Sequence, residues 1–354
     1  MKTILLINQA QFGYHSDTYY YCKYLCNSFD ITYICWDYGH EKIELKGINV
    51  IYISRKGNIA IRNLRFIWKV LKELQNNYDF NLIKYFRGCS SLKILNPKKK
   101  FLFDIRTGSV NKKNLYRHVY DFFMKTEGKL FQHISVISKS LAQKLNIDKK
   151  AYILPLGADI ISDTNKKFNS INLLYVGTLS NRNIEQTIKG FSKFYHEYNG
   201  RVEISYTIIG SGFENETHEI KKIVFEEKLT EAVKLTGQLP HDKLKPYFDK
   251  CNIGVSFIPQ TDYFDVQPPT KTFEYFLSGM PVIATNTKEN AIVVNKKNGI
   301  LINDDSESFF EGLIKILNNK NQYNSEIIRR TSMQFTWHTI VADLRCHLEA
   351  INRA

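Results

Sequence analysis

Short apolar runs rich in β-branched residues alternate with helix-forming stretches along the chain. In the first half these runs are ILLIN, ITYIC, VIYIS, LIKYF, FLFDI, ISVIS and YILPLG, and in the second half INLLYVG, ISYTIIG, VKLTG, IGVSFIP, PVIAT and GILIN. Stretches with apolar residues three and four apart intervene, such as 184–197, 216–227 and 306–317. This alternation predicts an α/β fold with doubly wound parallel sheets, whose ligands bind beyond the carboxyl ends of the strands.

The alternation is interrupted at 158–170. The segment ADIISDTNKKFNS is polar and has no clear periodicity, and the INLLYVG that follows it begins a new strand. A chain of 354 residues is long enough for about two domains of roughly 150 residues each. We therefore predict a Rossmann-like domain over 1–160, a second one over 161–335 that faces it across a cleft, and a terminal segment over 336–354.

Composition excludes several classes of protein. Hydrophobic residues make up 43% and charged residues 24% of the chain, so a disordered or collagen-like chain is excluded. No window approaches 18 uninterrupted apolar residues, and the apolar run near the N-terminus is too short for a signal peptide. We therefore expect a cytosolic protein without a transmembrane helix. The six cysteines lack C-x-x-C spacing, so neither a metal site nor a disulfide framework is expected.

The net charge of +14 is confined to the first half of the chain. Residues 1–160 hold 26 Lys and Arg against 12 Asp and Glu, whereas 161–354 hold 23 of each. This asymmetry is compatible with a compositional bias, an anionic membrane surface or a phosphorylated acceptor. Nucleic acid is disfavoured as a partner because no basic recognition helix or RNA-binding signature is present.

The segment 57–77 is a candidate basic amphipathic helix. Its apolar stripe is Ile61, Leu64, Trp68 and Leu71, flanked by Arg62, Arg65, Lys69 and Lys72. Such a helix can lie on anionic lipid at the inner face of the cell membrane. It can equally be a crossover helix that packs on a sheet, and the sequence leaves both interpretations open.

Two glycine turns in the second half follow predicted strands. In INLLYVGTLSNRNI a strand ends at Gly177 and a helix begins near Asn183, with Arg182 at its mouth. A helix N-terminus with an arginine is suited to an anion. In TIIGSGFE, Gly210 and Gly212 form either half of a dinucleotide fingerprint or an ordinary tight turn.

The segment 264–285, FDVQPPTKTFEYFLSGMPVIAT, carries the most specific pattern. Its two prolines exclude helix before Thr270, which is expected to cap a helix that stops at Gly279. The free N–H groups of the first turn, together with Lys271, would hold a diphosphate, and Glu274 would accept hydrogen bonds from a ribose diol. The alternative is an exposed Lys271–Glu274 ion pair on an ordinary helix.

Segment 171–303 resembles the donor-binding domain of retaining glycosyltransferases of family 4, which have the GT-B fold. The resemblance rests on LLYVGTL, IIGSG, VKLTGQLPHDKLKPYF, PPTKTFEYFLSGMPVIAT and NGILIN, in that order. LPLGAD resembles the family's interdomain Pro-x-Gly-x-Asp stretch, and TWHTIVADLRCHLEAI resembles its last helix, which crosses back to the N-terminal domain. The PPTK-x-x-EY form is similar to that of a sub-group with an altered loop, and the N-terminal half resembles the family only in architecture.

The resemblance implies a site for a nucleotide sugar, most often UDP-linked, that works without a divalent metal. The implied donor-binding residues are Gly177, Thr178, Arg182, Gly210, Thr270, Lys271 and Glu274. Arg182 and Lys271 would also act in catalysis, because they would stabilise the charge that builds on the β-phosphate as the glycosidic bond breaks. The chain departs from the family where Val266 replaces a sugar-contacting glutamate, and the adjacent Asp265 is a candidate stand-in.

Candidate acceptor residues lie at strand ends of the first half. In FDIRTGS, Asp104 and Arg106 alternate with apolar neighbours and form either a structural bridge or an acceptor contact. In QAQFGYHSD, Gly13 belongs to a loop that relatives place near the acceptor and donor phosphate, and His15 is a candidate polar contact with the acceptor.

The sequence therefore predicts an enzyme that transfers a hexose or N-acetylhexosamine from a nucleotide sugar to a glycan or lipid-linked acceptor. The resemblance implies a place in bacterial surface polysaccharide synthesis. Two other hypotheses are a GT-B sugar-nucleotide epimerase and a non-catalytic basic protein that binds membrane or nucleic acid. The epimerase would need carboxylates and histidines around the sugar as acid and base groups. The loop motif of this chain does not resemble one that supplies them.

Overall fold

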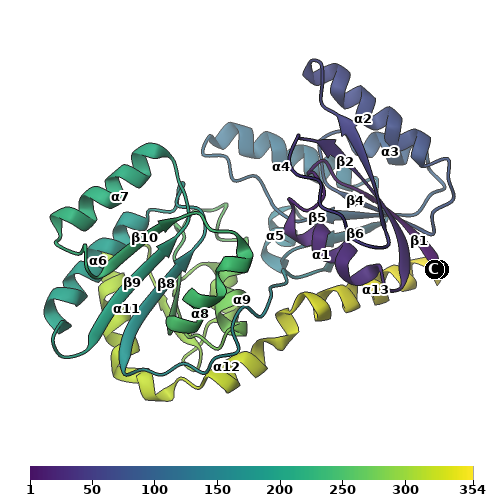
Figure 1. Cartoon of the computed structure of the whole chain (residues 1–354). Coiled ribbons are helices and arrows are strands. Elements are labelled where there is room, and N and C mark those ends of the chain that lie inside the picture. The colour runs from purple at the N-terminus through teal and green to yellow at the C-terminus, as the bar shows by residue number, and fades with distance from the viewer. Residues whose placement is uncertain (354) are drawn as a thin grey trace. The chain divides into compact units, whose positions relative to one another are not determined.

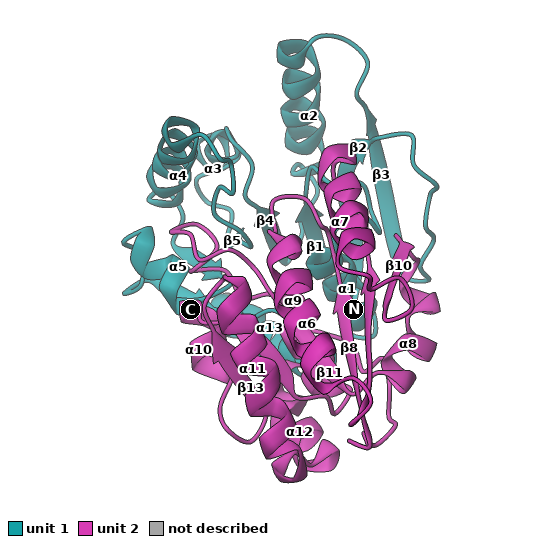
Figure 2. Ribbon diagram, turned by 90° about the vertical axis from the view of Figure 1, so that its left-hand side faces the viewer, with its two compact units in different colours: residues 1–156, 337–354 teal, residues 157–336 magenta. Residues whose placement is uncertain are grey.

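A computed structural model describes residues 1–353 of the chain, and side chains up to Ile351. The chain divides into two compact units (Figure 2): unit 1 comprises residues 1–156 and the helix from Trp337 onward, and unit 2 comprises Gly157–Thr336. Each unit is built around one parallel sheet, as the alternation of apolar runs and helical stretches predicts.

Unit 1 has a seven-stranded sheet in the order β3-β2-β1-β4-β5-β6-β7, with every pair parallel. Its strands are β1 (Lys2–Ile7), β2 (Phe29–Asp37), β3 (Ile48–Ser54), β4 (Phe80–Lys84), β5 (Phe101–Ile105), β6 (His133–Val136) and β7 (Ala151–Ile153). Its helices are α1 (Ser16–Leu25), α2 (Ile59–Glu73), α3 (Ser90–Leu95), α4 (Asn114–Gly128), α5 (Lys139–Lys144) and α13 (Trp337–Arg353).

Helices cover both faces of this sheet (Figure 1). The helices α2, α3 and α4 lie on one side, and α1 and α13 lie on the other. The central strand β1 is therefore buried on both faces, and its residues Ile4 to Ile7 are almost inaccessible to solvent. Continuous apolar runs such as ILLI form central parallel strands because neither face meets water. The terminal helix α13 packs on α1, where the rings of Trp337 and Tyr20 stack 4.8 Å apart.

Unit 2 has a six-stranded parallel sheet in the order β10-β9-β8-β11-β12-β13. Its strands are β8 (Ser170–Val176), β9 (Glu203–Ile209), β10 (Val233–Gly237), β11 (Ile253–Ser256), β12 (Val282–Thr285) and β13 (Gly299–Ile302). Its α-helices are α6 (Ile184–Tyr198), α7 (Glu214–Glu226), α8 (Lys245–Lys250), α9 (Thr270–Leu277), α10 (Lys288–Val293), α11 (Ser306–Asn319) and α12 (Ser325–Ser332). Its short 3-10 helices are η1 (His241–Lys243), η2 (Lys320–Gln322) and η3 (Met333–Phe335).

Both sheets change direction at their first strand. The chain moves from β1 outward to β2 and β3 and then returns to β4 on the other side of β1, and the same happens at β8 between β9 and β11. Such a switch point leaves a crevice at the carboxyl ends of the neighbouring strands. The residues that follow β1 and β8 are therefore the natural places to look for a site in each unit. Across residues 1–353, every helix is too short or too polar to cross a bilayer.

Candidate functional site

Two glycines meet at the switch point of unit 2. Gly177 follows β8 and Gly210 follows the neighbouring strand β9, and the N–H of Gly177 donates to the carbonyl of Ile209 over 2.9 Å. A Cβ atom on Gly210 would overlap the carbonyl oxygen of Gly177. Only glycine at 210 permits this approach, so the two turns form a single floor of exposed backbone.

A pocket of about 410 Å³ opens over these turns. It is lined by Val176, Gly177, Thr178, Ile209, Gly210, Ser211, Gln238 and Leu239, which follow the strands β8, β9 and β10. The lining combines two glycines and the polar residues Thr178, Ser211 and Gln238 with three aliphatic residues. The predicted residues Gly177, Thr178 and Gly210 thus share one pocket, whereas Arg182, Thr270, Lys271 and Glu274 are outside its lining.

The helix α9 begins at the predicted place but with a different cap. Pro269 is the N-cap residue and Thr270 is the first residue of the helix, without a side-chain capping bond. The prediction that Thr270 caps this helix is therefore wrong, because Pro269 already holds the extended conformation that a cap requires. The helix is fixed instead by buried Thr272, whose hydroxyl lies 2.7 Å from that of Ser256 and donates to Asn290.

Lys271 extends from α9 to the Gly177 turn. Its ammonium group lies 3.9 Å from the centroid of the Tyr175 ring, and a Cβ atom on Gly177 would lie 3.0 Å from it. The chain around it is held by Tyr275, whose hydroxyl accepts the N–H of Val176. Burial, together with the nearby charge of Arg182, lowers the pKa of Lys271 to about 7.

Arg182 stands before α6 with its guanidinium stacked on Phe264, 4.3 Å from the ring centroid. Burial lowers the pKa of Arg182, but a guanidinium stays charged at any physiological pH. It follows Asn181 and precedes Asn183, which both adopt left-handed backbone conformations that asparagine tolerates well. The tight loop brings Arg182 close enough to Lys271 for the two charges to repel each other. Two cations held close together beside a glycine turn are typical of a site for an anion.

Glu274 lies one turn further along α9 and is mostly buried, with 16% of its side chain exposed. Its carboxylate lies 4.0 Å from Nε2 of His241 in η1. Burial raises the pKa of Glu274, while His241 and Lys271 act in the opposite direction. The alternative of an exposed Lys271–Glu274 ion pair is therefore contradicted, since both side chains lie largely inside the protein.

His241 and Tyr175 are absent from the sequence prediction. His241 lies in the quoted motif VKLTGQLPHDKLKPYF, next to the pocket residues Gln238 and Leu239. A lone histidine after a turn gives no sign of the carboxylate it faces, which comes from a helix more than 30 residues later. In the sequence, Tyr175 is one of the apolar residues of a predicted buried strand. Its contact with the Lys271 ammonium group arises only when α9 packs against that strand.

Asp265 contacts the start of α10. Its carboxylate accepts the backbone N–H of Lys288 over 2.7 Å and pairs with the Lys288 ammonium group at 3.2 Å. It therefore holds the first residue of α10. The adjacent Val266 is buried in the loop, 5% exposed.

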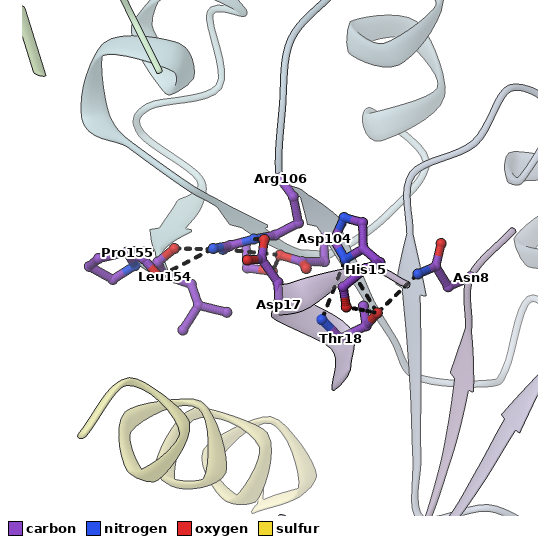
Figure 3. Close-up of polar contacts among 9 residues, drawn as sticks. Asn8, His15, Asp17, Thr18, Asp104, Arg106, Leu154 and Pro155 are labelled. Carbon is purple, nitrogen blue, oxygen red and sulfur yellow. Dashed lines mark hydrogen bonds and ion pairs between the residues drawn. The ribbon is translucent and has the colours of Figure 1, made fainter. Parts of the chain in front are cut away.

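In unit 1, Asp104 lies within β5 and Arg106 directly follows this strand, and both side chains are buried (Figure 3). The Nε of Arg106 donates to Asp17 of α1 over 2.6 Å, and its Nη atoms donate to the carbonyls of Leu154 and Pro155. Asp104 accepts from Ser135 and lies 3.9 Å from Arg106. Burial raises the pKa of Asp104 to about 6, against the opposing effect of Arg106. These contacts favour a structural bridge, but the main partner of Arg106 is Asp17, a residue of the first turn that the sequence analysis did not pair with it.

His15 and Gly13 form the turn after β1. His15 is the N-cap residue of α1, where its Nδ1 accepts from Thr18 (Figure 3). Burial and the nearby Lys84 lower the pKa of His15 to about 4, so its ring is neutral near pH 7. A Cβ atom on Gly13 would overlap the Ile43 side chain, which explains the glycine in packing terms.

The described residues contain no group of three or more His, Cys, Asp or Glu side chains placed to hold a metal ion. The pocket lining itself carries no charged side chain, but Lys271 lies beside its Gly177 turn, with the charge of Arg182 nearby. Its chemistry therefore suits an anionic ligand.

The comparison with protein families matches residues 170–319 to the family described as Glycosyl transferases group 1. This span contains the Gly177 turn, α9 and the pocket of unit 2. The match confirms the predicted enzyme class, a glycosyltransferase. No curated protein sequence matches the chain.

Solved structures of the same fold align over essentially the whole chain. Sucrose-phosphate synthase from Thermosynechococcus elongatus has 15% identity and a TM-score of 0.78, with 100% of both chains covered. Anabaena Alr3699/HepE in complex with UDP has 12% identity and a TM-score of 0.78, covering 99% of this chain and 100% of that one. The lipopolysaccharide outer core galactosyltransferase WaaB has 13% identity and a TM-score of 0.74, with 99% of both chains covered. These alignments confirm the predicted GT-B fold.

Proposed function

We propose that the chain is a retaining glycosyltransferase of family 4 that moves a hexose or N-acetylhexosamine from a UDP-sugar. The observation that carries the proposal is the meeting of the Gly177 turn with Lys271 and Arg182. A glycine turn without side chains, the N-terminus of α9 and two cations then converge at the switch point of a parallel sheet. This combination is suited to a diphosphate.

Lys271 and Arg182 would also assist the departure of the diphosphate. As the bond between the sugar and the diphosphate breaks, negative charge builds on the β-phosphate, which Lys271 and Arg182 would stabilise as fixed, preorganised charges. Burial supports this role, because a charge held away from water acts more strongly on its neighbour. In the front-face mechanism that the family resemblance implies, the acceptor hydroxyl attacks from the side on which the diphosphate leaves.

Glu274 would bind the ribose of the donor. A buried carboxylate on the second turn of α9, beside His241, is placed to accept two hydrogen bonds from a diol. The burial of this carboxylate costs free energy, which two hydroxyl donors would offset. The UDP complex of the similar Anabaena Alr3699/HepE supports uridine as the nucleoside.

We also propose an acidic contact with the sugar and an acceptor site in unit 1. Asp265 is adjacent in the sequence to Val266, the position of the missing glutamate, and its carboxylate contacts Lys288. His15 would meet the acceptor hydroxyl as a neutral hydrogen-bonding group, with Gly13, Asp104 and Arg106 shaping the loop around it. No divalent metal enters this proposal.

We further propose that the acceptor is a glycan or lipid-linked saccharide of bacterial surface polysaccharide synthesis. The similar fold of WaaB, a lipopolysaccharide galactosyltransferase, supports this setting. The basic unit 1 supports work at the inner face of the cell membrane, because anionic headgroups attract clustered lysine and arginine. The helix α2 fits that role, since Leu64 and Trp68 of its predicted stripe are 70% and 62% exposed.

A thermal-shift screen of UDP-, GDP- and ADP-sugars tests donor binding. A ligand present at about 100 times its dissociation constant stabilises the folded state by about 2.7 kcal/mol, so a true donor gives a clear rise in melting temperature. Release of UDP in the presence of a lipid-linked saccharide would then support transfer. Conversion of the free nucleotide sugar without UDP release would support the epimerase instead, and no shift with any nucleotide sugar would contradict both.

A further inference from the structure

The helix α4 presents an apolar face that unit 1 does not cover. Leu115, Tyr116, Val119, Phe122 and Phe123 are between 38% and 74% exposed. Their spacing of three and four residues places them on one side of the helix. Soluble proteins rarely expose contiguous apolar groups of this size unless the patch has a binding role.

Both acidic residues of α4 point away from this face. Asp121 accepts the backbone N–H of Ser109 over 3.1 Å, and its side chain is 14% exposed. Glu127 is buried and accepts the N–H groups of Gly88 and Ser90, so it caps the loop that leads into α3. The exposed face of α4 therefore carries no carboxylate among the described residues.

Basic residues border the same face. Lys112 and Lys113 are exposed before the first turn of α4, and Lys129 is exposed after its last turn. Arg117 is buried and donates to the carbonyls of Asn111 and Lys112, which fixes the loop that carries the two lysines. The loop is therefore held in place for binding, and its lysine side chains remain accessible.

Two neighbouring helices continue the surface. Figure 1 shows α2, α3 and α4 on the same side of the unit 1 sheet. Ile94 and Leu95 of α3 are each 61% exposed, and Leu64 and Trp68 in the stripe of α2 are 70% and 62% exposed. The opposite side of α2 packs on the sheet through Phe66 and Val70, so its outer stripe is not needed for folding.

We propose that this α2–α4 surface, with α4 as its main apolar element, docks onto an anionic lipid bilayer. We define the surface by Leu64 and Trp68 of α2, Ile94 and Leu95 of α3, and Leu115, Phe122 and Phe123 of α4. Aromatic and aliphatic side chains bordered by lysine, with inward carboxylates, match the apolar boundary and negative headgroups of such a bilayer. The inference extends the membrane location proposed above and does not depend on donor binding.

Charge argues against a second copy of the chain as the occupant. Two copies that meet through this surface would bring their own lysines together without carboxylates to neutralise them. An anionic bilayer supplies the opposite charge over the whole surface. The three helices lie along one side of the sheet, so their exposed side chains can contact a flat surface such as a bilayer together.

Co-sedimentation of the full chain with vesicles tests the proposal. Vesicles of phosphatidylcholine with phosphatidylglycerol should bind the wild type, and vesicles of phosphatidylcholine alone should bind it much more weakly. Phe122→Ser and Leu115→Ser should each weaken binding at least about tenfold, because each removes a large inserted side chain. Lys112→Gln with Lys113→Gln should weaken it about 25-fold, at about fivefold for each lysine near the surface.

Matched controls come from unit 2. Phe225 on α7 is 75% exposed and Lys222 is 53% exposed, so Phe225→Ser and Lys222→Gln change residues of the same kind outside the surface. These variants should bind vesicles like the wild type. Circular dichroism melting of each variant establishes that it is folded, which exposed positions of this kind should permit.

Two results would overturn the proposal. One is wild-type binding that does not change with phosphatidylglycerol content or with the α4 substitutions. The other is a dimer in sedimentation velocity that Phe122→Ser dissociates, with no vesicle binding by the monomer. UDP affinity measured on the same variants separates this outcome from failure of the proposed function, because the α4 substitutions should leave it unchanged.

Discussion

The ammonium group of Lys271 lies 3.9 Å from the centroid of the Tyr175 ring and directly beside the backbone of Gly177. A lysine in this position gives up much of its hydration, and Arg182 adds a like charge, so its pKa falls to about 7. A diphosphate at the same place would favour the charged form. Donor binding is therefore expected to be coupled to protonation of Lys271.

The first prediction is that UDP-glucose binds less tightly as the pH rises above about 7. The free protein loses the Lys271 proton through this range, so binding must then take up a proton, whereas below pH 7 the lysine is already charged. UDP-glucose is the right probe because its diphosphate has no ionisation near neutral pH. Calorimetry at several pH values measures the effect, and Lys271→Arg should flatten the profile. A flat wild-type profile would contradict the assignment.

The second prediction concerns recognition of the ribose. Glu274→Gln should weaken UDP binding by about 1–3 kcal/mol, the cost of losing hydrogen bonds to a charged acceptor. It should also reduce the preference for UDP over 2′-deoxy-UDP, since the lost contact is to the diol. Glu226→Gln, at a 58% exposed position of α7, serves as the control. An unchanged preference in Glu274→Gln would rule out the ribose role.

The third prediction is that Gly210→Ala disrupts the donor site. The added methyl group would overlap the carbonyl of Gly177, so the two turns must separate at a cost of about 1–3 kcal/mol. Melting temperature and UDP affinity should both fall. At Gly200 a Cβ would meet open space, and Gly200→Ala should cost only the backbone strain of about 1–2 kcal/mol and leave UDP affinity intact. Wild-type UDP affinity in Gly210→Ala would show that the close approach is not needed for binding.

The fourth prediction separates structure from acceptor binding at Arg106. Its guanidinium is 1% exposed and is paired with Asp17, so Asp17→Asn should destabilise unit 1 by about 3–5 kcal/mol. Adding Arg106→Met should restore part of that loss, because the uncompensated buried charge is then removed. Thermal unfolding of the two single variants and the double variant measures this coupling. A melting temperature close to wild type in Asp17→Asn would count against a structural bridge.

The sheet architecture follows from the sequence because apolar strand runs and helical periodicity are local signals. The predicted helices at 184–197 and 306–317 appear as α6 and α11. The end of β8 at Gly177 and the start of α9 after the two prolines are also set by local chemistry, namely a residue without a Cβ and a residue without an N–H. The donor-site residues predicted on these turns consequently lie near one another.

What the sequence missed depends on pairs of residues that meet only after folding. Asp17 and Arg106 are 89 residues apart, and the predicted partner of Arg106 was the nearer Asp104. His241 faces Glu274 across two elements, and Asp265 turns to Lys288. The apolar side of α4 was also missed, since the pattern of a helix with two apolar sides does not reveal which one the sheet covers.

The most direct test of the account is a calorimetric titration of the protein with UDP and with uridine, in the wild type and in Lys271→Ala. If the Gly177 turn, Lys271 and the start of α9 bind a diphosphate, the wild type should bind UDP far more tightly than uridine, and Lys271→Ala should lose most of that difference. Equal affinity of the wild type for UDP and uridine, or no binding of UDP, would contradict the account.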